Sequence, residues 1–225
     1  MQSYPHVRGE TETLGRVLAG ASIARYGDGE FKLCRGGSIK SQIYHDGIAA
    51  RLRAILQASG ACMVGIPNIL SATPKAAFWQ KYTESARLLA PRPYASSFIT
   101  RPDSAPWIDT PEYWTALESL WAGQDVTLVR GSHKGLTAED LASARTVREV
   151  LAPRQHAWTD YASILERVGK PQRAILCLGP TATVLAVDLA ARGVHAVDLG
   201  HVALFLRKYR RGESMTLTKD DKAAV

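Results

Sequence analysis

Short apolar segments of the strand type alternate along this chain with longer segments of the helix type. Such alternation is typical of βα units, in which a helix returns the chain to the start of the next parallel strand. The seven strand candidates are residues 22–26, 61–66, 94–99, 125–130, 146–151, 173–178 and 194–199. The sequence therefore predicts the α/β class, with a single doubly wound, mainly parallel, Rossmann-like sheet and helices on both faces.

Several helix candidates between these strands carry start signals. In Thr110-Pro111, the proline falls at the first helical position, where its missing N–H would have no partner within the helix. Thr137 and Asp140 have the spacing of a capping box. We expect helices over about 46–58, 74–89, 110–121, 157–168 and 181–192. Sheets of this kind bind ligands beyond the carboxyl ends of their strands, where the strand order reverses, so functional residues are expected in the loops that follow strands.

Length and composition fit one hydrophobic core. The chain has 225 residues, of which 46% are hydrophobic, and no linker rich in proline or serine divides it. We expect a single domain over residues 1–225, with a candidate flexible basic tail from about 207 to 225. The apolar run 174–191 is too interrupted to span a bilayer, and the charged N-terminus does not resemble a signal peptide. Three cysteines without metal-type spacing are consistent with a cytoplasmic protein.

The chain carries a formal charge of +7. This excess favours polyanionic partners, such as nucleic acid, anionic lipid or a phosphorylated substrate. We expect no nucleic-acid partner, because no reader motif is present. One basic cluster stands out, formed by Arg207, Lys208, Arg210 and Arg211. It is either a solvated helix end or a weak contact for anionic lipid at the inner membrane face.

Asp28 and Glu30 follow the first strand candidate and are separated by Gly29. On an extended segment, side chains two positions apart point to the same side. Two carboxylates arranged in this way suit Mg²⁺ or Mn²⁺, whose coordination is completed by water and substrate phosphates. The alternative interpretation is a surface turn, because Gly-Asp-Gly is also typical of hairpins.

A second candidate site element is Gly179-Pro180-Thr181-Ala182, which joins a buried-type strand to a helix. The N-terminus of a helix presents free N–H groups and the positive end of the helix dipole, which suit a diphosphate. An ordinary connection between a strand and a helix would have the same pattern. The complete Gly-x-Gly-x-x-Gly pattern is absent, so a dinucleotide site is not supported.

Asp198 lies at the end of the last strand candidate, Gly200 and His201 come directly after it, and all three should lie beside that loop. The histidine could donate to a phosphate oxygen, bind a metal or cap a helix.

Four other side chains are candidate substrate contacts. Arg25 and Arg101 could bind phosphate, because a planar guanidinium matches it in a bidentate way. Arg25 could equally form an ion pair with Glu30. Gln42 and Asn68 follow apolar runs and are candidate partners for sugar hydroxyls.

Two segments of the chain resemble one bacterial family, the GT-D-type glycosyltransferases. Arg25-Tyr26-Gly27-Asp28-Gly29-Glu30 matches the Arg-Phe-Gly-Asp-Gly-Glu signature of that family with one aromatic exchange. The second match covers residues 178–189 and 197–201, and weaker matches lie at 65–67, 99–102 and 153–157. The resemblance covers nearly the whole chain in the expected order.

This resemblance implies a GT-D-like fold and a metal-dependent transferase of the hexosyltransferase type. The donor would be a nucleoside-diphosphate sugar, such as a UDP-sugar, and the acceptor a glycan, a glycoprotein or a lipid-linked sugar of polysaccharide biosynthesis. Asp28 and Glu30 would bind Mn²⁺ or Mg²⁺ and act in catalysis with His201. The residues implied in donor binding are Arg25, Gly27, Gly29, Arg101, Gly179, Pro180, Thr181, Ala182, Asp198 and Gly200.

Other function classes remain open from the sequence. They are a basic nucleic-acid-binding protein, a Rossmann-like methyltransferase or nucleotide hydrolase, and a sugar-nucleotide-binding module without catalysis. A catalytic base could be Asp103, Asp109 or Glu112, and no spacing selects one. After His201 the chain lacks the acidic and aromatic residues that family members tend to carry there, which bears on the acceptor more than on the donor.

Overall fold

The computed structural model describes residues 3–71, 73–131, 135–218 and 221. Its centre is a seven-stranded sheet in the order β3-β2-β1-β7-β6-β4-β5. The six strand pairs are all parallel. The strands are β1 (Ser22–Arg25), β2 (Cys62–Ile66), β3 (Ala95–Ser96), β4 (Asp125–Arg130), β5 (Thr146–Leu151), β6 (Arg173–Cys177) and β7 (His195–Asp198). The predicted α/β class with a parallel sheet is confirmed.

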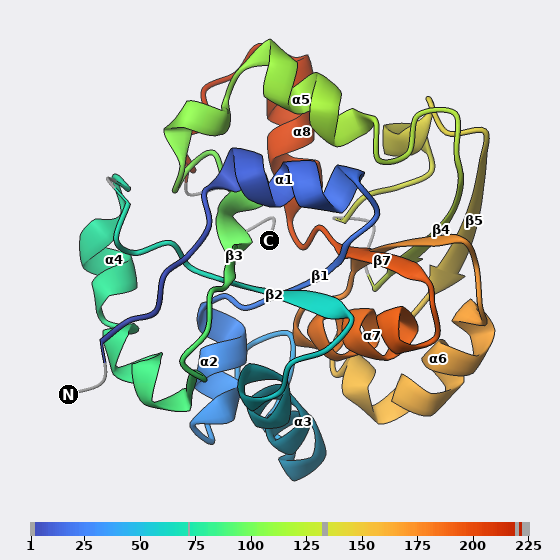
Figure 1. The fold of residues 1–225 in the computed structure, drawn as a ribbon. Helices are drawn as coiled ribbons and strands as arrows, with labels where there is room; N and C mark the ends of the chain where they lie inside the picture. Colours follow the sequence, from blue (N-terminus) through green and yellow to red (C-terminus); the bar gives the residue numbers. More distant parts are fainter. Residues whose placement is uncertain (1–2, 72, 132–134, 219–220, 222–225) are drawn as a thin grey trace.

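Helices cover both faces of this sheet (Figure 1). One face carries α1 (Glu10–Leu18), α5 (Pro111–Glu118) and α8 (Val202–Arg210). The other carries α2 (Asp28–Cys34), α3 (Asp46–Gln57), α6 (Tyr161–Val168) and α7 (Pro180–Ala191). The shorter elements are α4 (Ala76–Gln80) and the 3-10 helices η1 (Thr83–Leu88), η2 (Ser97–Thr100), η3 (Pro106–Ile108), η4 (Glu139–Leu141) and η5 (Ala157–Asp160).

Side chains of the central strands are buried on both faces of the sheet. In β1, Ile23 belongs to the larger hydrophobic cluster and its neighbour Ala24 to a second cluster, formed largely by β6, α6 and α7. In β4, Leu128 likewise belongs to the larger cluster and Val129 to the second one. Because successive strand residues point to opposite faces, two-sided burial explains why these strands read as continuous apolar runs.

The strand order reverses next to β1. From β1 the chain proceeds to β2 and β3 on one side. The strands on the other side of β1 are β7, β6, β4 and β5, and β7, the last strand in the sequence, pairs with β1. The carboxyl ends of β1 and β7 therefore form the switch point at which open α/β sheets bind ligands. The two strands are joined there, because the backbone N–H of Arg25 donates to Asp198 Oδ2 at 3.2 Å.

Some elements differ from the sequence-based expectation. The strand expected over 94–99 ends at Ser96, whose hydroxyl accepts the N–H of Phe98 (3.1 Å) and starts η2. The helix expected over 74–89 is divided into α4 and η1. Helices α1 and α2 were not expected. Residues 207–210, assigned from sequence to a candidate tail, form the last turn of α8, so the basic cluster lies at a helix end, one of the two alternatives that the sequence left open.

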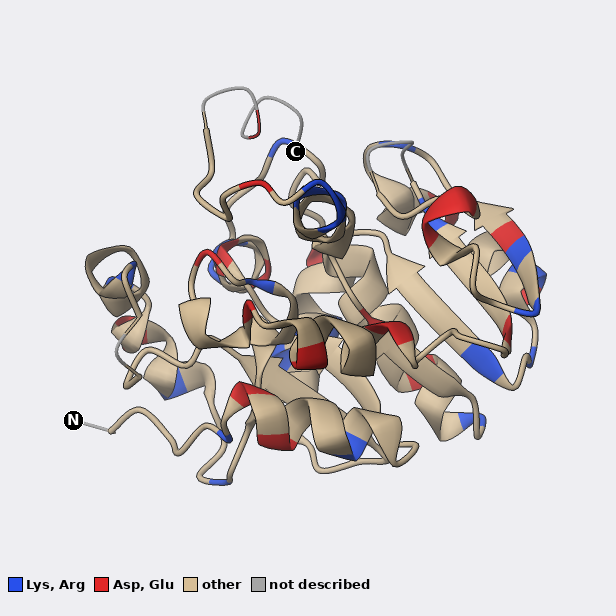
Figure 2. Ribbon diagram, turned by 90° about the horizontal axis from the view of Figure 1, so that it is seen from above, with Lys and Arg blue, Asp and Glu red and all other residues tan. Residues whose placement is uncertain are grey.

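The basic cluster of α8 is paired within the fold. Arg207 binds Asp140 (Nε–Oδ1, 2.9 Å), and Arg210 binds Glu118 (Nη2–Oε1, 2.6 Å). Lys208 is buried against Asp221 (Nζ–Oδ2, 3.1 Å), and Arg211 donates to Glu213. Figure 2 shows acidic and basic residues interspersed across the molecule. These four cations are therefore compensated by neighbouring carboxylates, which removes the structural support for a lipid-binding patch.

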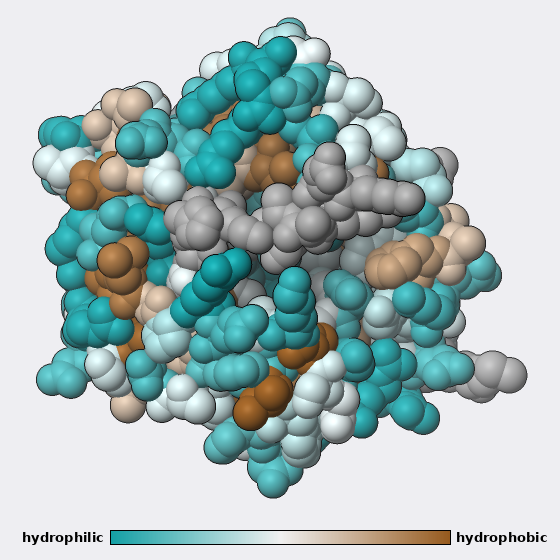
Figure 3. All heavy atoms as spheres, turned by 180° about the vertical axis from the view of Figure 1, so that it is seen from behind, coloured by the Kyte–Doolittle hydropathy of each residue, from teal (hydrophilic) through white to brown (hydrophobic). Residues whose placement is uncertain are grey.

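The face seen in Figure 3 carries hydrophobic residues as small, separate spots among hydrophilic ones. Within the described part of the chain, no helix combines the length and the hydropathy required to cross a bilayer. The apolar run 174–191 consists of β6 and α7, which pack inside the fold.

Candidate active site

The loops that follow β1 and β6 lie against each other at the carboxyl edge of the sheet. A methyl group built on Gly29 would lie 3.9 Å from Pro180 Cγ and 3.0 Å from Ile39 Cδ1, and one on Gly179 would lie 3.8 Å from Ser41 Oγ. The start of α2 and the start of α7 therefore lie next to each other, and both lie beside the segment 39–41. The structure brings the two predicted site elements together.

Asp28 and Glu30 occupy the first turn of α2, not an extended segment. The expectation that both carboxylates point to one side of a strand end is wrong, because Glu30 turns back to cap the helix. Its Oε2 accepts the N–H of Gly27 at 2.7 Å. Asp28 is exposed whereas Glu30 is buried. The two carboxylates thus have different environments, and Asp28 is the one presented to a ligand.

Burial changes the acid–base behaviour of Glu30. Desolvation raises its pKa to about 7, and the nearby carboxylates Asp198 and Asp28 act in the same direction. The backbone N–H groups of Gly27 and of Glu30 itself oppose this rise. A carboxyl group with such a pKa is partly protonated at neutral pH, and a bound cation would favour its ionised form.

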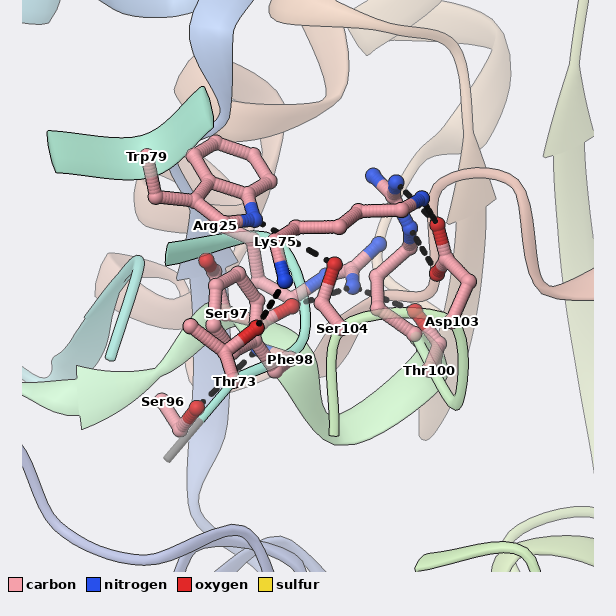
Figure 4. Close-up of polar contacts among 11 residues, drawn as sticks. Arg25, Thr73, Lys75, Trp79, Ser96, Ser97, Phe98, Thr100, Asp103 and Ser104 are labelled. Atoms are coloured by element: carbon pink, nitrogen blue, oxygen red, sulfur yellow. Dashed lines mark hydrogen bonds and ion pairs between the residues drawn. The ribbon is translucent and has the colours of Figure 1, made fainter. Parts of the chain in front are cut away.

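Arg25 lies inside the protein and binds protein groups. Its Nη1 donates to the carbonyl of Ser97 at 2.9 Å and to Thr100 Oγ1 (Figure 4). Its Nη2 lies 3.7 Å from Asp198 Oδ1. The alternative of an ion pair with Glu30 is wrong, since the partner is Asp198. This burial does not favour the predicted contact between Arg25 and a phosphate.

Asp198 and Gly200 complete this buried unit. Asp198 Oδ1 accepts the N–H of Gly200 at 3.0 Å. Burial raises the pKa of Asp198, while the charge of Arg25 opposes the rise. Gly200 has φ +51°, and a Cβ at this position would lie 2.2 Å from Arg25 Nη2. A side chain at position 200 would therefore displace the end of Arg25 and strain the backbone.

Arg101 is partly exposed and forms a two-point ion pair with Asp103, with Nε–Oδ1 and Nη2–Oδ2 distances of 2.8 Å (Figure 4). Lys75, which the sequence did not single out, binds the same carboxylate. Burial would raise the pKa of Asp103, but its two cationic partners outweigh burial and hold the pKa below the ordinary value. Asp103 is thus a weak base, although the sequence offered it as a candidate catalytic base.

The other two candidate bases, Asp109 and Glu112, have different surroundings from Asp103. Asp109 accepts the indole N–H of Trp114 at 3.0 Å. Glu112 is exposed in the first turn of α5.

His201 stands at the start of α8 with its side chain reached by solvent. Desolvation by the surrounding protein, together with the charges of Arg101 and Arg25, lowers the pKa of His201 to about 4, while the carboxylates of Asp28 and Asp103 act in the opposite direction. These influences show that His201 shares one electrostatic environment with residues from the ends of β1 and η2. Its imidazole is neutral near pH 7 and can donate one hydrogen bond.

The start of α7 combines a left-handed glycine with a proline. Gly179 has φ +56° and is exposed, and Pro180 is the first residue of the helix. Thr181 and Ala182 are buried, and the N–H of Ala182 donates to the carbonyl of Gly179 (2.8 Å). Thr183 Oγ1 donates to the carbonyl of Arg25 (2.9 Å), which fixes α7 to β1. The first N–H groups of a helix suit an anion.

The amide of Gln42 is occupied within the fold. Its Nε2 donates to the carbonyl of Ile43 (2.9 Å), and its Oε1 accepts the N–H of Trp158 (3.3 Å). Gln42 therefore holds two loops together, although the sequence suggested a contact with a sugar.

In the part of the chain that the structure describes, no group of three or more His, Cys, Asp or Glu could hold a metal ion. Asp28 fits a cation ligand because its carboxylate is exposed, whereas buried Glu30 caps α2. One or two carboxylates suit Mg²⁺ or Mn²⁺ when substrate phosphates complete the shell.

The glycosyltransferase GT-D fold family model matches residues 23–224. The chain belongs to the GT-D family. A solved structure described as the highly conserved domain of unknown function 1792, with a distinct glycosyltransferase fold, is 30% identical to this member. It superimposes with a TM-score of 0.84, covering 96% of this chain and 86% of that one. A glycosyltransferase from Streptococcus sanguinis is 28% identical, with a TM-score of 0.81 over 93% of this chain and 86% of its own.

Two curated relatives are longer than this chain. A probable glycosyl transferase, Gly, of Streptococcus gordonii is 31% identical over 87% of this chain and 31% of its own length. Glycosyltransferase GlyD of Streptococcus pneumoniae serotype 4 is 27% identical over 87% of this chain and 26% of its own length. This GT-D member therefore spans less than a third of either relative.

Proposed function

We propose that this chain is a metal-dependent glycosyltransferase. It would move a sugar from a nucleoside-diphosphate sugar, such as a UDP-sugar, to a glycan, a glycoprotein or a lipid-linked acceptor. The observation that carries the proposal is that exposed Asp28 and the start of α7 lie together at the switch point of a GT-D sheet. In a metal-bound diphosphate, the carboxylate would bind the metal ion and the helix N-terminus would bind the negatively charged phosphates.

Asp28 would hold the cation, with the carboxyl group of Glu30 close behind it, and the cation would supply positive charge to neutralise the diphosphate. Around it, the start of α7 would orient the leaving diphosphate through the positive end of the helix dipole. Negative charge grows on that group as the bond between the sugar and the phosphate breaks, so the dipole would stabilise the transition state more than the ground state. Neutral His201 would donate its N–H to an oxygen of the donor. Arg25, Asp198 and Gly200 would hold the ends of β1 and β7 in place.

A direct test measures UDP release from a panel of UDP-sugars with Mn²⁺ or with a chelator, with and without methyl hexopyranosides as acceptors. The proposal predicts release that requires the metal and increases with an acceptor. Release that is equal with and without acceptor would instead indicate a nucleotide-sugar hydrolase. Binding of S-adenosylmethionine without binding of any UDP-sugar would favour the methyltransferase alternative.

A further inference from the structure

A half-exposed tryptophan is held by a buried carboxylate near the candidate active site. Trp107 belongs to η3, and its indole N–H donates to Glu10 Oε2 at 2.8 Å. Glu10, the first residue of α1, is only 2% exposed. By contrast, 44% of Trp107 is exposed, whereas Trp79, Trp114 and Trp121 are fully buried.

The carboxylate of Glu10 is fixed from two further directions. Ser96 Oγ donates to Oε1 at 2.7 Å, and Asn68 Nδ2 donates to the same oxygen at 3.3 Å. Three donors from three separate segments therefore compensate one buried carboxylate and fix it in place. Because Trp107 is one of these donors, its ring has a set orientation while much of its surface faces solvent.

This pair is linked to Arg25 through the end of β3. Ser96, which binds Glu10, precedes Ser97, whose carbonyl accepts Arg25 Nη1 (Figure 4). Glu10 and Arg25 also both act electrostatically on the buried hydroxyl of Tyr113. Glu10 begins α1, on the sheet face that also carries α5 and α8, whereas α7 covers the other face over β1 and β7 (Figure 1).

A rigid, exposed indole suits one class of ligand. A hexopyranose presents an apolar face of C–H groups, and these carry partial positive charge that matches the negative face of an aromatic ring. Binding to a pre-oriented ring also avoids the entropy cost of ordering a side chain. The half-buried amide of Asn68 donates to the same carboxylate as the indole. It adds a polar group of the kind that orients a sugar.

We propose that Trp107 is a stacking platform for a hexopyranose of the acceptor, and that Glu10 is its positioning residue. The inference rests on the proposed function, which assigns the donor to the start of α7. The ends of β2 and β3, where Asn68 and Ser96 hold Glu10, are then left for the acceptor. Here Trp107 would touch the sugar directly, whereas Glu10 would act by holding the ring.

The test follows the indole N–H signals of the tryptophans by NMR during titration with methyl β-D-glucopyranoside, methyl β-D-galactopyranoside and methyl N-acetyl-β-D-glucosaminide. The Trp107 signal, identified by its loss in Trp107→Phe, should shift with at least one sugar. In Trp107→Ala, the KM for that methyl glycoside as acceptor should rise about fivefold or more. UDP release without acceptor should be unchanged.

Two control variants separate stacking from folding. Phe78→Ala removes another exposed aromatic ring and should leave the acceptor KM unchanged. Glu10→Gln keeps an oxygen for the indole and should stay near the wild-type KM, whereas Glu10→Ala should resemble Trp107→Ala. An unmoved Trp107 signal with all three sugars, or an unchanged acceptor KM in Trp107→Ala, would overturn the inference. Absence of UDP release by the wild type would contradict the proposed function instead, and the NMR result would stand separately.

Discussion

Arg25, Asp198 and Gly200 depend on one another at the switch point of the sheet. The guanidinium of Arg25 lies where a side chain at position 200 would begin. The carboxylate of Asp198 accepts hydrogen bonds from the backbone N–H groups of Arg25 and Gly200. All three residues belong to the segments that resemble the GT-D family. Their contacts point to a role in holding the ends of β1 and β7, while Asp28 and His201 face solvent.

Gly200→Ala should therefore destabilise the fold strongly. The added methyl group would displace Arg25 in addition to straining the backbone, so we expect the free energy of unfolding to fall by about 2–4 kcal/mol. Gly212→Ala is the matched control, because Gly212 also has a positive φ (+66°) but open space around it. Its strain alone should cost about 1 kcal/mol. Chemical denaturation measures both, and equal losses in the two variants would contradict the close approach of Arg25.

Glu30 should make stability depend on pH. Its pKa is about 7 in the folded protein and near 4.5 in the unfolded chain, so the folded state binds more protons between these values. The contribution of Glu30 is therefore fully present below about pH 4.5 and is lost as the pH rises through 7. Relative to Glu30→Gln, we expect the wild type to lose about 1–3 kcal/mol of unfolding free energy over this range. Parallel pH profiles for the two proteins would show that Glu30 is not shifted.

At the scale of elements, the strands were predictable and several helices were not. The strands near 125–130 and 146–151 have the expected bounds, because their apolar residues are bounded by turn-forming ones. Helix α2 escaped prediction because it has seven residues, carries Gly29 in its first turn and begins directly after β1. Glycine disfavours helix interiors, and here the capping contact from Glu30 to Gly27 compensates for it.

The candidate site was predictable in its parts but not in its pairings. The loops after β1, β6 and β7 stand out from the sequence through their glycines and polar residues. The contact of Arg25 with Asp198 depends on β7 lying next to β1, and no local pattern encodes that strand order. Glu10 and Trp107 are 97 positions apart, so their hydrogen bond also follows from the tertiary fold alone.

The two ends of helix α7 offer a comparison that isolates donor binding. Gly179 precedes the helix and Gly193 follows it, and both have positive φ values (+56° and +79°). Gly179→Ala places a methyl group where we expect the diphosphate to meet the backbone, so the Kd for UDP should rise about tenfold. Gly193→Ala should strain the chain without changing this Kd. Equal UDP affinity in both folded variants would leave the start of α7 as an ordinary connector.

At the scale of the whole molecule, many basic side chains are paired with carboxylates of the same chain, which the net charge does not indicate. The formal charge of +7 suggested a basic contact surface, yet the four cations at the end of α8 bind carboxylates of the same chain. Positive charge also meets negative charge at the candidate site, where Arg101 and Lys75 share Asp103. Net charge therefore informs solubility and long-range attraction more than it identifies a partner.

The central claim is that the GT-D switch point binds a nucleoside diphosphate through a cation at Asp28. Calorimetric titration of UDP in the presence of Mn²⁺, repeated with a chelator, tests it most directly. The wild type should bind only with the metal, and Asp28→Asn should lose at least about tenfold in affinity while its melting temperature stays close to that of the wild type. Asp46→Asn is the matched control, because Asp46 is likewise an exposed carboxylate at the first position of a helix. Equal, metal-dependent affinity in Asp28→Asn and Asp46→Asn would contradict the account.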